Sequence, residues 1–297
     1  MVILSVVFVV GASLGIALQM GLTRPEAEAI KEPVRIETPP VASRSIAVKP
    51  ETPVVTLDEL QTTLEKMVAS RRGTWSVYVK DLDTAQSISI NNGTMPAASL
   101  IKIFVMATVF DQIERGELED SETIRNLLTR MITISENEAW YQLVPILGNG
   151  WYGPGARKIN EYALANGYLD TIHYGDYSHP QYTLALDVSQ TSVRDCGLLL
   201  ERIYNGECVS KEASASMLEL LQKQTLLSKI PAGLPKGVKS ANKTGELSGI
   251  QNDVALVFAP GGTYVICVMS EDVSDYASEQ TFIAELSHVV YLYLEDV

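Results

Sequence analysis

Apolar positions along this chain follow helical and strand spacing in turn, and their order predicts two groups of strands separated by a long helical block. Residues 57–71 carry apolar side chains at the spacing that one face of a helix requires. Residues 74–80 and 86–90 alternate apolar and polar side chains on either side of a polar turn, as in a hairpin. Helical spacing then dominates residues 98–222, apart from an irregular stretch at 168–190.

Three more segments with strand spacing precede a last helix. They cover residues 240–247, 252–259 and 263–270, with Gly261-Gly262 as the expected hairpin turn, and residues 278–294 return to helical spacing. Strands near both ends of the domain bury their apolar faces most simply by joining one sheet. We therefore predict an α+β fold: a mainly antiparallel five-stranded sheet flanked by helices, with an all-helical lobe beside it.

The first segment, residues 1–22, has the length and composition of a membrane anchor. Residues 2–22 contain no charged side chain, and a helix of this length spans about 30 Å, one bilayer core. A cleaved signal peptide is the alternative, although no basic residue and no clear Ala-x-Ala cleavage site precede Arg24. Either reading places the domain outside the cytoplasm, while Lys31 and Arg35 on the far side of the span favour the opposite orientation.

Residues 23–55 contain six prolines, which block helix and sheet, and we expect an extended spacer. Anchor and spacer each sum to zero charge, so the net charge of −13 falls on the predicted domain at 56–297. An acidic domain argues against nucleic acid and anionic membrane surfaces as partners. The cysteines are odd in number, and Cys196 and Cys267 lie in apolar segments, which favours core positions over a disulfide framework or a metal site.

Ser99 and Lys102 begin an apolar run that predicts a helix starting beside Pro96. At a spacing of three, the two side chains share one helical face. A serine hydroxyl becomes a good nucleophile when a base removes its proton. A lysine among apolar neighbours can be that base, because burial lowers its pKa and the positive potential of the helix N-terminus favours the neutral amine.

Two further motifs follow in order: Ser135-Glu136-Asn137 and Lys243-Thr244-Gly245. By itself the first is more often a helix cap, and an exposed edge strand with a turn is the alternative for the second. Together with Ser99-x-x-Lys102, in this order and spacing, they resemble the motifs of the penicillin-recognising serine hydrolases, and specifically the class A β-lactamase-like branch. The resemblance covers residues 56–297 and implies that family's two-lobed fold, with the site at the seam.

The resemblance implies roles for residues in the helical lobe. Ser99 would be the nucleophile and Lys102 its proton partner. Ser135 would relay a proton to the leaving nitrogen, since a hydroxyl both donates and accepts. Asn137 would hold the substrate amide, while Glu136, where the family commonly has aspartate, would point away from the substrate.

The resemblance also assigns the later motif to substrate binding. Lys243 and Thr244 would bind a substrate carboxylate, and Gly245 would let the backbone come close to the ligand. The oxyanion hole would consist of the backbone N–H groups of Ser99 and Glu246.

The loop at 168–180 departs from the family. Class A β-lactamases carry a Glu-x-x-Leu-Asn pattern there, whose glutamate activates the water that releases the acyl-enzyme, and this chain has no such pattern. Asp170 or Asp176 comes nearest by spacing, so we expect acylation to be intact and deacylation to be slow or to use another group. His173 and His179 lie beside Asp176, and we expect loop histidines with ordinary hydrogen bonds rather than a metal site.

Four aromatic residues near the motifs, Trp140, Tyr141, Trp151 and Tyr152, are expected in the core and the cleft wall. The sequence thus predicts a membrane-tethered, extracytoplasmic, monomeric serine hydrolase that needs no cofactor or metal. Its substrate would be a β-lactam or a D-alanyl-D-alanine-type peptide. A penicillin-binding D,D-peptidase stays open as an alternative, as do a sensor that acylates once and a noncovalent wall-peptide binder.

Overall fold

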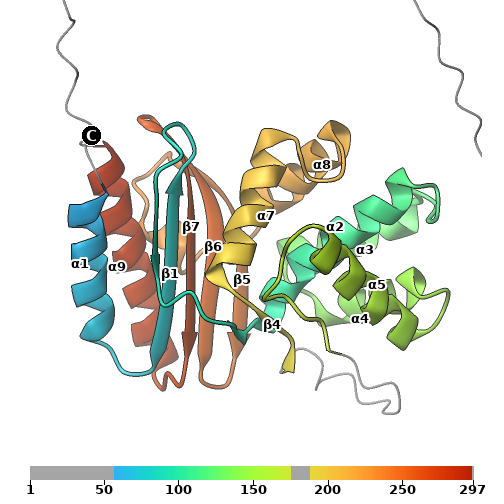
Figure 1. The fold of residues 1–297 in the computed structure, drawn as a ribbon, viewed down its shortest axis with the longest axis horizontal. Coiled ribbons are helices and arrows are strands. Elements are labelled where there is room, and N and C mark those ends of the chain that lie inside the picture. The colour runs from blue at the N-terminus through green and yellow to red at the C-terminus, as the bar shows by residue number, and fades with distance from the viewer. Residues whose placement is uncertain (1–56, 175–187, 296–297) are drawn as a thin grey trace, which may run out of the picture. The chain divides into compact units, whose positions relative to one another are not determined.

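Five strands form one antiparallel sheet in the computed structural model, which describes residues 57–174 and 188–295. The sheet order is β2-β1-β7-β6-β5 (Figure 1), and each neighbouring pair is antiparallel. The strands are β1 (Thr74–Asp81), β2 (Ser87–Ile90), β5 (Lys239–Leu247), β6 (Ile250–Ala259) and β7 (Gly262–Glu271). The predicted five-stranded sheet is confirmed, and β5, which carries the Lys-Thr-Gly motif, is an edge strand.

Helices cover both faces of the sheet. On one face lie α1 (Asp58–Ala69) and the last helix α9 (Tyr276–Glu295), and on the other lies α7 (Val193–Asn205) (Figure 1). An apolar core that includes Trp75 and Phe282 fills the space between the sheet and the first pair of helices. Gly197 of α7 packs directly on the Tyr78 ring, and an added Cβ there would lie 2.5 Å from the ring.

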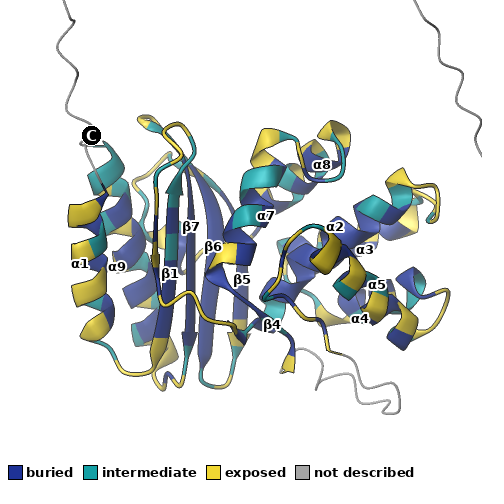
Figure 2. Cartoon of the chain, viewed as in Figure 1, coloured by how far each residue is buried: buried dark blue, intermediate teal, exposed yellow. Residues whose placement is uncertain are grey.

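The helical lobe is built around α2 (Ile101–Glu114). Eleven of its fourteen residues are buried (Figure 2), so the helix is surrounded by others instead of showing one face to solvent. Its neighbours, with α7, are α3 (Glu122–Thr133), α4 (Asn137–Leu147), α5 (Tyr152–Ala165) and α8 (Lys211–Gln222). This all-helical lobe confirms the second part of the fold prediction.

Short elements not predicted from the sequence fix the joint between sheet and lobe. Strands β3 (Met95–Pro96) and β4 (Gln190–Thr191) pair with each other, and the 3₁₀ turn η1 (Ala98–Leu100) leads into α2. A second 3₁₀ turn, η2 (Ile230–Gly233), precedes β5.

Several sequence predictions need correction. The β6–β7 turn is Pro260-Gly261, not Gly261-Gly262, because Ala259 pairs with Gly262 across the hairpin. Trp151 is 73% exposed and so is not a core residue, whereas Trp140 is fully buried as expected. The predicted core positions of Cys196 and Cys267 are confirmed.

The predicted anchor at 1–22 and spacer at 23–55 lie outside the described residues, and the domain boundaries stay predictions. Within the described ranges, no helix is long and apolar enough to cross a membrane.

Gly155 lets α5 approach α4 at backbone contact. A Cβ added there would lie 1.8 Å from the Val144 carbonyl oxygen, so Gly155→Ala must push the two helices apart. We expect a loss of unfolding free energy of about 1–3 kcal/mol, measured by urea unfolding. Gly93→Ala is the matched control, since nothing lies within 4 Å of its added Cβ. Equal losses in the two variants would contradict this packing.

Candidate active site

The three motifs meet where the edge strand β5 contacts η1 and the turn between α3 and α4. Ser99 lies on η1 and is half-buried, and Lys102 follows one turn later in α2. The expected helix therefore begins as a 3₁₀ turn, in which residues three apart still lie on one side.

The backbone just before Ser99 is held in an unfavourable conformation. Ala98 has a φ of +48°, a region that residues other than glycine rarely occupy and that costs about 1–3 kcal/mol. The Asn252 side chain fixes this segment, because its Nδ2 donates to the carbonyl oxygens of Pro96 at 3.0 Å and Ala97 at 3.3 Å. Gly245 lies against the same segment, and an added Cβ would be 2.9 Å from the Ala97 carbonyl oxygen. The strain is typical of a functional position.

Lys102 is fully buried, and its Nζ donates to the Ser135 carbonyl oxygen and to Asn137 Oδ1, both at 2.6 Å. Burial lowers the pKa of Lys102 from 10.5 to about 7, although the charge of Glu136 opposes the shift. A neutral amine keeps two N–H donors, enough for both 2.6 Å bonds, and frees a lone pair. The amine can therefore act as a base near neutral pH.

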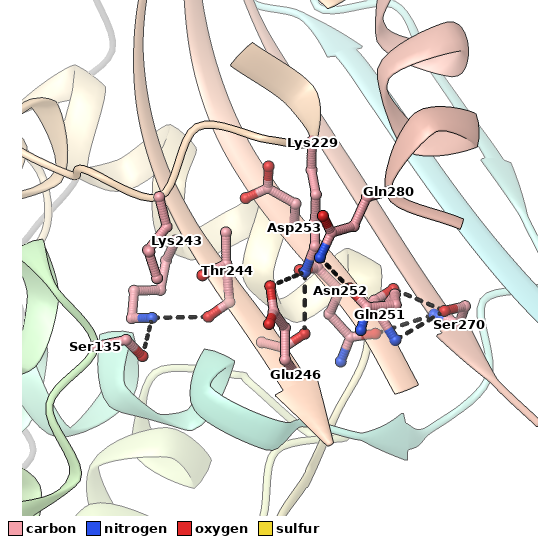
Figure 3. Close-up of polar contacts among 12 residues, drawn as sticks. Ser135, Lys229, Lys243, Thr244, Glu246, Gln251, Asn252, Asp253, Ser270 and Gln280 are labelled. Atoms are coloured by element: carbon pink, nitrogen blue, oxygen red, sulfur yellow. Dashed lines mark hydrogen bonds and ion pairs between the residues drawn. The ribbon is translucent and has the colours of Figure 1, made fainter. Parts of the chain in front are cut away.

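Ser135 does not cap α4, as the alternative reading of its motif required. Glu136 is the N-cap residue, without a side-chain cap bond, and it forms an ion pair with Arg130 at 3.0 Å. Ser135 has a φ of +58°, and its Oγ accepts from Lys243 Nζ at 2.7 Å and from Lys102 Nζ at 3.4 Å (Figure 3 shows the Lys243 contact). One hydroxyl therefore bridges two buried lysines.

Lys243 and Thr244 are buried, at 0% and 2% exposure, so this motif is not an exposed edge. Lys243 Nζ also donates to the Thr244 carbonyl oxygen at 2.7 Å. Burial and the nearby charge of Lys102 hold the pKa of Lys243 well below its ordinary value. No carboxylate among the described residues lies within 4 Å of its Nζ, so in this part of the chain Lys243 has no ion-pair partner.

Three polar residues that support the site were not predicted from the sequence. Lys229 is fully buried beside β5, and its Nζ lies 2.9 Å from Glu246 Oε1. Asp253 accepts from the Ile230 N–H at 2.9 Å, and burial raises its pKa to about 6. The third is Asn252. The polar run Gln251-Asn252-Asp253 in a strand that is apolar elsewhere was the signal that could have found two of them.

The loop residues that the sequence offered as candidates have different outcomes in the structure. Asp170 Oδ1 accepts from Thr94 Oγ1 at 3.5 Å, and no contact joins it to the lysines or Ser135 in the described structure. The predicted hydrogen bonds of His173 are wrong for its ring: it is buried against Trp140 and Tyr152, and neither ring nitrogen has a hydrogen-bond partner. Its burial lowers the pKa of His173 to about 4. Asp176 and His179 lie outside the described residues.

The profile of a family described as the "Beta-lactamase enzyme family" matches residues 59–126 and 119–294. The chain belongs to this family. Among proteins of curated function, none matches the chain by sequence. Membership of this family accounts for the order of the three motifs.

Solved structures of other proteins share this fold. A structure of PBP-A is 25% identical, with a TM-score of 0.73, and the match covers 82% of this chain and 98% of that one. A β-lactamase from Sphaerobacter thermophilus DSM 20745 is 20% identical with a TM-score of 0.69, over 82% of this chain and 99% of that one. The class A β-lactamase GNCA, an ancestral protein, is 21% identical with a TM-score of 0.69, over 79% and 99%. The fold is thus that of class A β-lactamases and PBP-A.

The lowered pKa of Lys102 predicts how stability depends on pH. The folded protein loses this proton near pH 7 and the unfolded chain near 10.5, so the unfolded state binds more protons between these values. Stability of the wild type should therefore rise with pH across this window relative to Lys102→Met, by up to about 1.4 kcal/mol per pH unit.

Urea unfolding across that window measures the difference. Lys223→Met is the control, because Lys223 is exposed and, among the described residues, forms its ion pair with Glu219 one turn earlier. If the wild type and Lys102→Met had the same pH dependence, Lys102 would hold its proton in the folded state.

Proposed function

We propose that this domain is a serine hydrolase that opens β-lactam amides through an acyl-enzyme on Ser99. The observation that supports it most is the contact chain from Lys102 through Ser135 to Lys243, one turn from Ser99. This arrangement would supply a base, a proton relay and a carboxylate-binding cation within one site.

In the first step, Ser99 Oγ attacks the carbonyl carbon of the amide and its proton passes to the neutral Lys102. The carbonyl oxygen becomes an oxyanion, and the N–H groups of Ser99 and Glu246 would stabilise it. One such donor commonly contributes about 3 kcal/mol to the transition state. The strained Ala98 would hold the Ser99 N–H in place for this contact.

In the second step, the carbon–nitrogen bond breaks and the leaving nitrogen takes a proton. Ser135 Oγ would donate that proton and receive one from the Lys102 ammonium, which returns to the neutral amine. The bond from Lys243 Nζ to Ser135 Oγ, at 2.7 Å, orients the hydroxyl for this exchange. Over the two steps Lys102 and Ser135 recover their starting states, and one proton has passed from Ser99 to the leaving nitrogen with none exchanged with solvent.

Substrate binding would use both sides of the pocket. Lys243 and Thr244 would bind a substrate carboxylate, since Lys243 is a buried lysine without an ion pair in the described part of the chain and an arriving carboxylate would favour its charged form. Asn137 Oδ1 is occupied by Lys102, which leaves the exposed Nδ2 to donate to the substrate acyl amide.

Release of the acyl group would be slow. The chain lacks the Glu-x-x-Leu-Asn pattern, and Asp170, one of the two residues nearest to it by spacing, contacts Thr94 in place of the lysines. A penicillin-binding D,D-peptidase or sensor is therefore the second candidate. The likeness to PBP-A favours it, as does the structure of a PBP-A point mutant, 24% identical, captured as an acyl-enzyme with penicillin G. Either activity would act outside the cytoplasm, where the predicted anchor would hold the domain.

Intact-mass spectrometry of the chain with excess benzylpenicillin, followed over time, tests this function. We expect an adduct of the mass of the drug that persists for hours on the wild type and never forms on Ser99→Ala. Clearance within seconds, with hydrolysed drug accumulating, would show fast turnover and contradict slow release. The absence of any adduct would overturn the proposed function.

The base role of Lys102 predicts a pH profile for acylation. Because the neutral form is required and the pKa is about 7, the acylation rate should level off above pH 7 and fall below it. Well below that pKa, the fall should approach about tenfold per pH unit. Lys102→Arg keeps a cation but cannot act as a base, and we expect its acylation to drop by at least about a hundredfold. A flat profile through pH 7 would exclude this role.

A further inference from the structure

Another fully buried lysine, Lys229, lies beside β5, and its ion-pair partner is Glu246 of that strand. Lys229 is fully buried, and its Nζ lies 2.9 Å from Glu246 Oε1 (Figure 3). The same Nζ donates to the Asn252 carbonyl oxygen at 3.0 Å. The side chains of this ion pair have no part in the reaction proposed above, which uses only the backbone N–H of Glu246.

Glu246 is the carboxylate that forms an ion pair with Lys229, and the charge of the buried Asp253 also favours the charged form of Lys229. Within the described ranges, no other carboxylate lies within 4 Å of Lys229 Nζ. Asp253 is close enough to act on the pKa of Lys229, but its oxygens accept from the Ile230 N–H and the Asn242 amide. The Glu246 side chain is 46% exposed, so the ion-pair partner of a fully buried lysine lies at the protein surface.

The position of Glu246 on β5 places its charge beside the substrate carboxylate. β5 pairs with β6 one to one from Lys239 to Leu247, without a bulge, so side chains two apart leave the strand on the same face. Glu246 therefore shares a face with Thr244, which is proposed to bind that carboxylate. The charges of Glu246 and Lys229 are also among those that act on the pKa of Lys243.

We propose that Glu246 is a specificity residue that competes with the substrate carboxylate for the cations of this pocket. The inference rests on the proposed function and narrows its substrate class. An acyl donor with a free carboxylate must meet the negative charge of Glu246 or displace it from Lys229. An acyl donor that is neutral or cationic at that position, such as a peptide whose chain continues past the scissile amide, meets no such repulsion.

Two matched compounds test the proposal: benzylpenicillin, which carries a free carboxylate, and its neutral methyl ester. The readout is the ratio of their acylation rates, the free acid over the ester, on the full chain by intact-mass spectrometry. Glu246→Gln keeps the backbone N–H and the shape of the side chain while removing the charge. Glu117→Gln is the control, since Glu117 forms an ion pair with Lys158 in the helical lobe.

We expect the ratio to rise about tenfold in Glu246→Gln, as removal of one partly screened like charge implies, and to stay unchanged in Glu117→Gln. Glu246→Ala should raise the ratio in the same direction, which guards against a fold defect in one variant. The same ratio in all the proteins, with adducts forming normally, would overturn the specificity role alone. If neither compound forms an adduct on any of them, the proposed function falls and this inference with it.

Discussion

The site depends on one hydroxyl held between two buried lysines. Ser135 Oγ accepts from Lys243 at 2.7 Å and from Lys102 at 3.4 Å, and both lysines are shielded from water. Two ammonium groups so close repel each other, and burial penalises each charge further. Loss of one proton relieves both effects. In the proposed reaction, Lys102 acts in its neutral form as the base and Lys243 in its charged form as the carboxylate-binding cation, which divides two roles between otherwise similar side chains.

The surrounding backbone fixes these groups in place. Ser135 and Ala98 both have positive φ, a strain that persists only where neighbouring contacts hold it. The Asn252 side chain binds the two carbonyl groups before Ala98, and Gly245 allows β5 to pack against them. The sheet and the helical lobe therefore meet at backbone contact, and the pocket is shaped by a joint that tolerates little change.

Much of the fold could be predicted from the sequence, because apolar spacing reports which face of each helix and strand is buried. The segments at 57–71, 74–80 and 240–247 match α1, β1 and β5 closely. The two-residue strands β3 and β4 could not be predicted, since they carry no periodic signal and pair over a long separation. Trp151 was misplaced because a large aromatic side chain usually lies in a core, whereas here it is exposed just before α5.

Some residues of the candidate site could likewise be predicted from the sequence, and others could not. Ser99, Lys102, Ser135 and Lys243 could be selected because their spacing matches motifs of a known family. Lys229 could not, since a single lysine in a loop has no pattern, and its burial beside Glu246 depends on how β5 and β6 pair. The ring of His173 is buried without hydrogen bonds, which no rule of composition would predict.

The proposed reaction depends above all on Lys102 losing its proton near pH 7 in the folded protein. NMR of isotope-labelled lysine side chains measures it directly, with the Lys102 resonance assigned by its absence from Lys102→Met. We expect the Lys102 resonance to titrate near pH 7. Titration near the ordinary lysine value of 10.5 would contradict it, because Lys102 would then hold its proton and could not accept one from Ser99.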